Sequence, residues 1–381
     1  MKILCVEFEN LNHFEDGKFR IDFFATDRVF DTSNVYKVFK NIYTQKIISF
    51  IGLNAAGKTT ALRLLNIAIN VVVYNIDLNQ LKTPNMIQDG SVMRVTFFHN
   101  EEIHQLESVI GYTGGKYYYR EEILRSKVKS KIQSRAGLTE FNEVNLVRSH
   151  LSSSEKKYLD DGKSIIAPVV KDNGCYVADN LFFNYVNIMN TFGETPAPII
   201  ELFDESIERL STESITVGKK EFQWNLKFKN DDLTYNATEP IALNFLISTG
   251  TIRGQGLVSL AIEVLRTGGY LIIDELEMHL NKEIVRVILS LFNDRRTNPK
   301  GACLIFSTHY VEILDFALLD RKDNIYITRK FDGLLSVGKF SDEFKRNDFK
   351  KSEVIFSNAL TGTAPKYETI QRLRDFVCKS L

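Results

Sequence analysis

The amino-terminal part of the chain alternates between apolar and polar positions. Residues 2–8 show this period of two, and residues 19–23 continue it, so the pattern predicts two strands joined near Gly17. Residues 91–98 and 116–119 have a strand-like pattern as well. We therefore expect a small antiparallel layer built from the first third of the chain.

Other stretches are apolar without alternation. Residues 46–51, 270–273 and 302–306 are short apolar runs, which are typical of strands buried on both faces. A helix is predicted at 282–292, between the second and the third of these runs. Strand, helix and strand in this order indicate a parallel sheet.

Two further helices are predicted near this sheet. Residues 58–73 are apolar on all faces, which indicates a helix buried in the middle of a domain. Residues 251–267 form the second helix, and Gly268 and Gly269 end it.

The middle of the chain has a weaker pattern. Between 121 and 217 there are helical pieces such as 199–210, but no heptads that would predict a long coiled coil. Residues 222–228 alternate and predict a half-buried strand, which the turn residues 230–232 end.

Composition narrows the class of protein. The 381 residues include 48 basic and 48 acidic side chains, so the net charge is zero and a globally basic nucleic-acid binder is excluded. The four cysteines are far apart, so neither a disulfide framework nor a zinc knuckle is predicted, and a reducing cytoplasm is the expected location. No run of 18 apolar residues and no signal-peptide pattern is found, so we expect no membrane partner.

The segment after the first apolar run, GLNAAGKT, fits the phosphate-binding pattern G-x-x-x-x-G-K-[ST]. Its backbone N–H groups would surround the phosphates, Lys58 would reach the β- and γ-phosphates as a catalytic residue, and the Thr59 hydroxyl would bind Mg²⁺. ATP and Mg²⁺ are therefore the predicted cofactors. The predicted nucleotide-binding residues are Gly52, Asn54, Ala55, Ala56, Gly57, Lys58, Thr59 and Thr60.

Two carboxylates and a histidine follow the other apolar runs. Asp274 ends the run at 270–273 and is placed to hold Mg²⁺, while Glu275 is placed to orient and deprotonate the attacking water. His309 follows the next run and is a candidate catalytic residue that senses the γ-phosphate. A surface histidine without such a role is the alternative.

Ser248 and Gly250 precede the helix that leads to Asp274. A hydroxyl and a glycine at a helix start suit phosphate binding, and they suit plain helix capping equally well.

Together these motifs resemble an ABC-type ATPase head of the SMC, RecF and OLD group. The Asn of GLNAAGKT matches that group's G-x-N-G-x-G-K-[ST], although Ala55 replaces the usual Gly. IDELEMHLNKE and STHYVEIL resemble its Asp-Glu segment and its histidine switch, with Asn281 and Lys282 in place of His-Pro. Residues 320–370 resemble the C-terminal region of stand-alone AAA-type ATP-binding proteins of bacterial phage-defence and abortive-infection operons, such as the ATPase subunits of Septu or PARIS systems.

The resemblance implies a fold and a division of the chain. The expected fold class is α/β: a P-loop ABC-type ATPase head with a mostly parallel sheet, an antiparallel N-terminal layer and a mainly helical insertion. Residues 1–125 would carry the P-loop, 126–240 would be the insertion, and 241–381 would carry the signature, the Asp-Glu pair and the histidine switch.

In that family the signature Ser and Gly act on ATP bound to the other subunit. Carried over, Ser248 and Gly250 would cap the γ-phosphate across a homodimer or a higher homo-oligomer, with Ile247 at the position of the usual Leu. The resemblance also makes His13 a candidate contact to the base and Gln105 a candidate Q-loop residue.

Two functional classes fit these features. The first is an ATPase that acts as a sensor and scaffold in antiviral defence and controls a separate effector protein, expected to be a nuclease. The second is a DNA-repair or chromosome-maintenance ATPase of the RecF and SMC kind that acts directly on DNA. Nucleic acid stays a candidate partner because of the basic run RSKVKSKIQSR, for which a solvated surface is the alternative.

Overall fold

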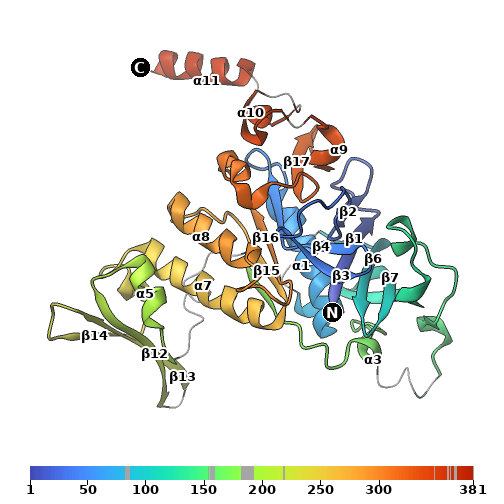
Figure 1. Cartoon of the computed structure of the whole chain (residues 1–381), viewed down its shortest axis with the longest axis horizontal. Coiled ribbons are helices and arrows are strands. Elements are labelled where there is room, and N and C mark those ends of the chain that lie inside the picture. The colour runs from blue at the N-terminus through green and yellow to red at the C-terminus, as the bar shows by residue number, and fades with distance from the viewer. Residues whose placement is uncertain are drawn as a thin grey trace.

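The computed structural model of the protein describes residues 1–81, 86–152, 154, 159–181, 193–217, 219–346, 348–357, 360, 362–363 and 367–380. Its central sheet has the strand order β10-β15-β16-β5-β17-β18 (Figure 1). These strands are β5 (Ile47–Ile51), β10 (Val177–Asn180), β15 (Tyr270–Ile273), β16 (Cys303–Ser307), β17 (Ile325–Phe331) and β18 (Leu334–Lys339). Neighbours pair in parallel except β17 and β18, which form an antiparallel hairpin. The predicted parallel sheet is confirmed.

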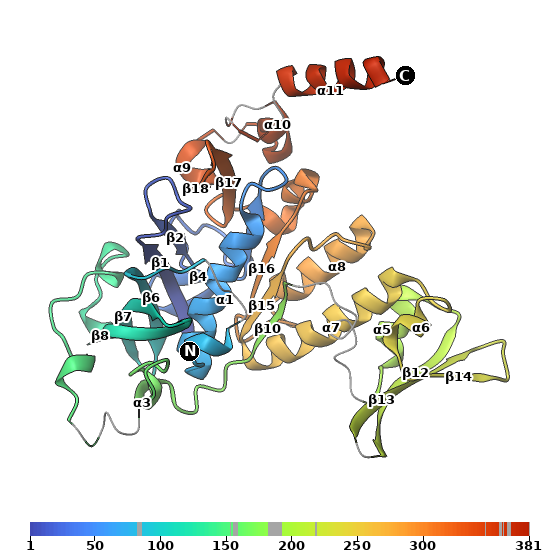
Figure 2. The same cartoon turned by 180° about the vertical axis from the view of Figure 1, so that it is seen from behind.

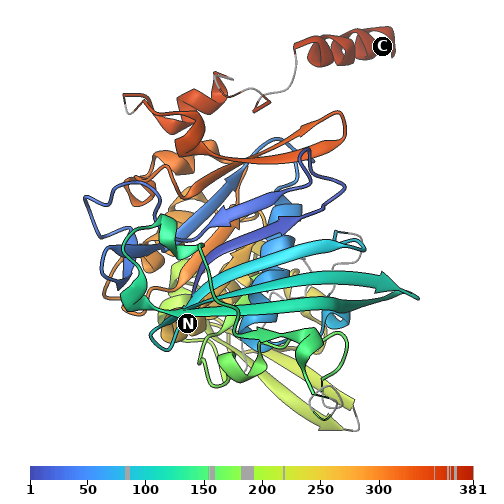
Figure 3. The same cartoon turned by 90° about the vertical axis from the view of Figure 1, so that its right-hand side faces the viewer.

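An antiparallel sheet packs beside the central one and has the order β2-β1-β6-β7-β8-β9. Figure 3 shows its long strands crossing the body of the protein. The strands are β1 (Lys2–Glu9), β2 (Phe19–Asp22), β6 (Ser91–His99), β7 (Glu102–Thr113), β8 (Lys116–Val128) and β9 (Leu146–Val147). The predicted antiparallel layer is confirmed, and it is larger than expected. Strand β7 was missed because it buries polar residues, among them His104, Gln105 and Ser108, which hide its alternation.

Helix α1 (Lys58–Tyr74) lies between the two sheets. The core around it includes Val6 and Phe97 from the antiparallel sheet and Ile48 and Ile272 from the parallel sheet. This position explains why apolar side chains surround the helix, since each of its faces is covered by protein.

Two helices cover the other face of the parallel sheet. They are α7 (Thr249–Thr267) and α8 (Lys282–Asn293), and their apolar residues share a core with Leu271 and Leu304. Gly268 ends α7 with a positive φ of 73°, as the sequence predicts. Both helices are confirmed.

In the described part of the segment 126–240, strands contain more residues than helices, so the prediction of a mainly helical insertion is wrong. A sheet of order β11-β12-β13-β14 projects beside α7 (Figure 2). Its elements are β11 (Gly193–Glu194), β12 (Ile207–Val217), β13 (Lys219–Phe228) and β14 (Thr234–Ala237), with α5 (Ala197–Phe203) and α6 (Pro240–Leu243) beside it.

The helix predicted at 199–210 ends early for a local reason. The Asp204 carboxylate accepts hydrogen bonds from the Ser206 backbone N–H at 3.0 Å and from its hydroxyl at 2.6 Å. This turn stops α5 at Phe203, and the chain continues as β12. Strand β10 also comes from the segment 126–240, yet it pairs with β15 of the central sheet.

Short elements complete the fold. They are β3 (Val35–Phe39), β4 (Ile42–Gln45), α3 (Ala167–Val170), η1 (Leu78–Gln80), η2 (Lys129–Lys131), η3 (Ala136–Leu138), η4 (Arg148–His150), η5 (Val311–Asp315), η6 (Ala317–Leu319), α9 (Phe340–Glu343), α10 (Lys351–Phe356) and α11 (Tyr367–Ser380). Helix α11 stands away from the body in all three views (Figures 1–3). Among the described helices, none combines the length and the apolar character that crossing a membrane requires.

Candidate active site

The predicted chemistry gathers at one edge of the parallel sheet. Strand β16 lies between β15 and β5, and the three strands run in the same direction. Their carboxyl ends therefore bring together the loop after Gly52, the pair Asp274 and Glu275, and His309. Binding sites of parallel α/β sheets lie at this edge.

The phosphate-binding loop turns sharply into α1. Gly57 has φ 96°, and a Cβ added there would lie 2.8 Å from the Leu335 side chain, so both conformation and space require glycine. Within the described residues, no side chain caps the start of α1. The backbone N–H groups of Lys58, Thr59 and Thr60 precede the first intrahelical hydrogen bond, which Ala61 donates to Gly57. These groups are suited to phosphate oxygens.

The Lys58 ammonium folds back over this loop. Its Nζ donates to the carbonyls of Gly52 at 2.9 Å and Leu53 at 3.1 Å, and it lies 3.5 Å from Nδ1 of His309. Burial lowers the pKa of Lys58, while nearby carboxylates, foremost Asp274, act in the opposite direction. A partly desolvated cation that donates to two neutral carbonyls is well prepared to bind an incoming triphosphate.

The Asp274 carboxylate links the ends of the three strands. One of its oxygens accepts from the Thr59 hydroxyl at 2.6 Å, and the other accepts from the hydroxyl of Ser307. A threonine hydroxyl beside a carboxylate is the oxygen donor set that Mg²⁺ uses together with phosphates. The residues present therefore fit a magnesium ion held by Thr59 and Asp274.

Glu275 is held in a strained backbone conformation. Its φ is 49°, in the left-handed region, and its backbone N–H donates to the Ser307 hydroxyl at 2.8 Å. One carboxylate oxygen lies 3.4 Å from Nε2 of His309. The strained turn thus presents the carboxylate toward the cavity beside the histidine.

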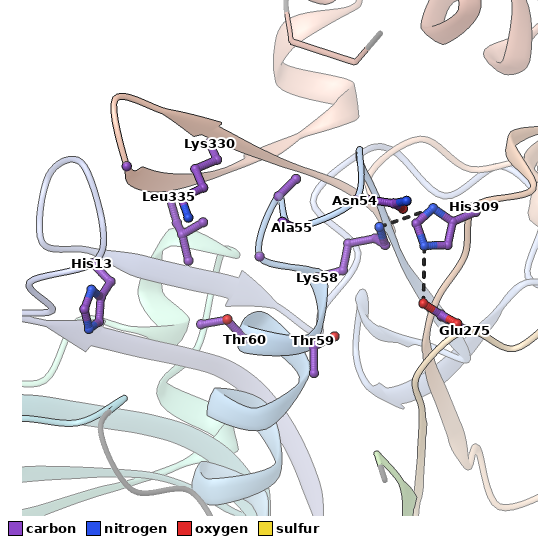
Figure 4. A pocket seen from close by; sticks show the side chains of 13 residues that line it. His13, Asn54, Ala55, Lys58, Thr59, Thr60, Glu275, His309, Lys330 and Leu335 are labelled. Atoms are coloured by element: carbon purple, nitrogen blue, oxygen red, sulfur yellow. Dashed lines mark hydrogen bonds and ion pairs between the residues drawn. The ribbon is translucent and has the colours of Figure 1, made fainter. Parts of the chain in front are cut away.

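A cavity of about 390 Å³ joins these groups. Figure 4 shows His13 on one side, Glu275 and His309 on the other, and Lys58 and Thr59 between them. The cavity is lined by His13, Asn54, Ala55, Ala56, Gly57, Lys58, Thr59, Thr60, Glu275, His309, Lys330, Gly333 and Leu335.

Ser248 and Gly250 are not part of this wall as far as the described residues show. The Ser248 hydroxyl accepts from the Thr251 backbone N–H at 3.0 Å and so caps α7. Gly250 lies against the turn after Glu275, where an added Cβ would be 2.5 Å from the His279 carbonyl oxygen. Gln105 is buried in β7 near Thr96 and also stays outside the wall.

Arg253 connects α7 to the same turn. Its guanidinium donates to the carbonyls of Glu275 at 2.9 Å, Asp274 at 3.2 Å and Met278. Only 1% of Arg253 is exposed, and burial lowers its pKa to about 10. The helix that begins at the signature is therefore fastened to the backbone of the predicted catalytic carboxylates.

Three residues at or beside the site were not predicted from the sequence: Arg253, Glu277 and Lys330. The Glu277 carboxylate accepts from the backbone N–H of His309, which fixes the histidine loop. The second glutamate of IDELE was a visible signal for Glu277. Neither Arg253 nor Lys330 has a local signal, because each reaches the site only through tertiary packing.

The basic run of the sequence is engaged within the chain. Arg125 lies 3.4 Å from a Glu107 oxygen, and Lys127 donates to the carbonyls of Gly137 and Glu140. The same is true of the others, which pair as Lys129 with Glu101, Lys131 with Glu143, and Arg135 with the Thr26 carbonyl. These contacts favour a structural role over a phosphate-binding surface.

Residues 47–315 match the family model described as "AAA domain, putative AbiEii toxin, Type IV TA system". The chain belongs to this AAA domain family. The match extends from β5 to η5 and includes the phosphate-binding loop, the Asp-Glu pair and His309, so it covers well over half of the chain. Membership implies a nucleotide-binding ATPase domain. No curated protein sequence matches the chain significantly.

We expect Lys58→Ala to abolish tight ATP binding, because the triphosphate loses its fixed counter-charge. Glu275→Gln should still bind ATP, while turnover falls by roughly 10²–10⁴-fold because the base is lost. Nucleotide titration and phosphate release measure the two effects, with Lys282→Ala on the exposed side of α8 as control. Wild-type turnover by Glu275→Gln would show that another group acts as the base.

Arg253→Met should leave ATP bound but slow hydrolysis by roughly 10–100-fold, because the carbonyls that fix Asp274 and Glu275 lose their donor. The matched control is Arg266→Met on the same helix, since Arg266 is exposed and pairs with Glu263. Steady-state turnover with saturating ATP checks this prediction. Equal turnover in both variants would mean that Arg253 does not position the carboxylates.

Proposed function

We propose that the protein is an ATPase that dimerises around Mg²⁺–ATP and controls a separate effector protein, most simply a nuclease, in antiviral defence. The observation that carries the enzymatic part is the convergence of Lys58, the Thr59–Asp274 pair and the Glu275–His309 pair on one cavity. Membership of the AAA domain family supports the same activity.

Each side chain has a role in this proposal. Lys58 and the N–H groups at the start of α1 bind the β- and γ-phosphates, and His13 contacts the base. Thr59 and Asp274 hold Mg²⁺, which neutralises phosphate charge when it is bound. Glu275 accepts the proton of the attacking water, and His309 orients Glu275 and contacts the γ-phosphate.

The dimer is inferred because the signature residues Ser248 and Gly250 are not among the described residues that line the cavity. Ser248 is exposed and lies at the positive end of α7, yet the described wall of the cavity does not include it. A second copy related by a two-fold axis would bring its Ser248 and Gly250 to the γ-phosphate and complete both sites at once. ATP would then be buried between the two subunits and would stabilise the pair.

The link to an effector rests on α11 and on the family resemblance of the tail. Ile370, Leu373, Phe376 and Val377 follow helical spacing, and each is at least partly exposed. An amphipathic helix with an open apolar face commonly docks into a groove of a partner protein. We therefore assign effector binding to α11, with the β11–β14 sheet as the second candidate surface.

Ser248→Asp should prevent ATP-driven dimerisation and hydrolysis, because a carboxylate would face the partner's triphosphate. We expect at least a 100-fold weaker dimer, while ATP still binds in cis. Light scattering in the Glu275→Gln background measures the dimer.

The matched control is Ser248→Asn, which has the same shape without the charge. Both side chains preserve the helix cap, whose loss would cost about 1 kcal/mol, so a difference between the variants is not a folding effect. Equal dimerisation of the two variants would contradict the placement of Ser248 at the partner's phosphates.

The protein alone should hydrolyse ATP without cutting plasmid, linear DNA or tRNA in the presence of Mg²⁺ or Mn²⁺. A tagged Glu275→Gln protein in its native host, loaded with ATP, should retain a second protein that cuts nucleic acid. Leu373→Asp should lose that protein and keep ATP binding, whereas Asp375→Lys, on another face of α11, should retain it.

Other outcomes of this experiment separate the two functional classes. Strongly salt-dependent binding of DNA by the purified protein would favour the DNA-repair alternative. Cleavage by the protein alone that persists in Lys58→Ala would reveal a nuclease centre in the chain itself and would overturn the proposal of a separate effector.

A further inference from the structure

A large apolar side chain is exposed to solvent next to the signature residues Ser248 and Gly250. Phe245 is 87% exposed, and its neighbour Leu246 is also exposed. Both lie in the turn between α6 and α7, and Ser248, three residues after Phe245, is exposed as well. Leaving a phenylalanine in water is unfavourable, and such residues mark contact surfaces when a matching pocket exists.

A matching pocket lies beside the nucleotide cavity. It has a volume of about 490 Å³, and its apolar wall comes from Leu53, Val311, Ile355 and Phe356. Asn54 and His309 belong to the walls of both cavities, so the pocket begins where the γ-phosphate end of the nucleotide cavity stops. Phe356 on α10 is 61% exposed at the rim.

We propose that Phe245 of one subunit inserts into this apolar pocket of a second copy of the chain. The inference rests on the proposed ATP-dependent dimer and adds to it the side chain that anchors the two subunits. The contact is self-complementary, because a two-fold axis places each Phe245 in the pocket of the other subunit.

The reach of the chain supports this pairing. Once Ser248 lies at the partner's γ-phosphate, Phe245 is at most about 10 Å away, since three residues span no more than that. The apolar pocket adjoins the γ-phosphate end of the nucleotide cavity, because Asn54 and His309 belong to both walls. The occupant is therefore a second copy, because only that copy brings Phe245 there together with Ser248.

The first test replaces the anchor. In the Glu275→Gln background with Mg²⁺–ATP, Phe245→Asp should weaken the dimer by roughly 10–100-fold, as the loss of a central aromatic anchor does. ATP binding by the monomer should not change. The control is Leu233→Asp, which changes another exposed apolar residue, 63% exposed, in the turn before β14.

The second test locates the anchor. The protein carries Phe245→Cys and Phe356→Cys. It also carries Cys378→Ser, because Cys378 is exposed and would react, whereas the other native cysteines are buried. A short bis-maleimide should then join two subunits when ATP is present and fail to do so without ATP. In the control protein, Leu233→Cys replaces Phe245→Cys while Phe356→Cys is kept. The reagent should not join its subunits, either with or without ATP.

The outcomes distinguish the proposal that Phe245 anchors the interface from the proposal that ATP drives dimerisation. If Phe245→Asp dimerises like Leu233→Asp, or if ATP induces no cross-link in a protein that dimerises, the anchor is wrong and the ATP-dependent dimer stands. If Glu275→Gln with native Phe245 stays monomeric with ATP, the proposed dimer and the anchor both fail.

Discussion

The carboxylate of Asp274 is the contact on which the arrangement of the site depends. It accepts the hydroxyls of Thr59 and Ser307, and thereby joins the start of α1 to the ends of β15 and β16. The Ser307 hydroxyl in turn accepts the backbone N–H of Glu275 in its left-handed turn. Because these bonds are short and connect different strands, they hold the residues predicted to bind phosphate and metal and to activate water in one rigid arrangement.

Much of this frame could be predicted from the sequence, because its signals are local. A glycine-rich loop between a buried strand and a helix, and a carboxylate pair after an apolar run, are contiguous motifs with a known geometry. The parallel direction of the strands followed from the order strand, helix, strand along the chain, whereas the order of the strands in the sheet was not predicted. Arg253 and Lys330 escaped prediction because their roles arise from packing between elements distant in the sequence. His13 was a candidate only through the family resemblance, and the loop before β2 brings it to the cavity wall.

In the segment before Ser248, by contrast, the sequence pattern did not predict the structure correctly. A weak apolar pattern favoured helix at 199–210, whereas residues from Ile207 onward pair with β13 in a β12–β13 hairpin. A single Asx turn at Asp204 was enough to end α5 and begin a strand. In the antiparallel sheet, polar residues buried in β7 hid the alternation that would have predicted this strand. Strand β13 was predicted from its own alternation, whereas β12 and β7 are recognised only by their pairing with neighbouring strands.

Helix α7 has Ser248 at its N-terminal end, contacts α5 beside the β11–β14 sheet, and is hydrogen-bonded through Arg253 to the turn that carries Asp274 and Glu275. In the proposed dimer, a ligand of that sheet that tilts α7 would change the free energy of ATP-dependent association. Thermodynamic linkage would make the effect reciprocal, so association would change the affinity of the sheet for its ligand by the same factor. Ligand binding to the projecting sheet and nucleotide binding would thus be coupled through the position of α7.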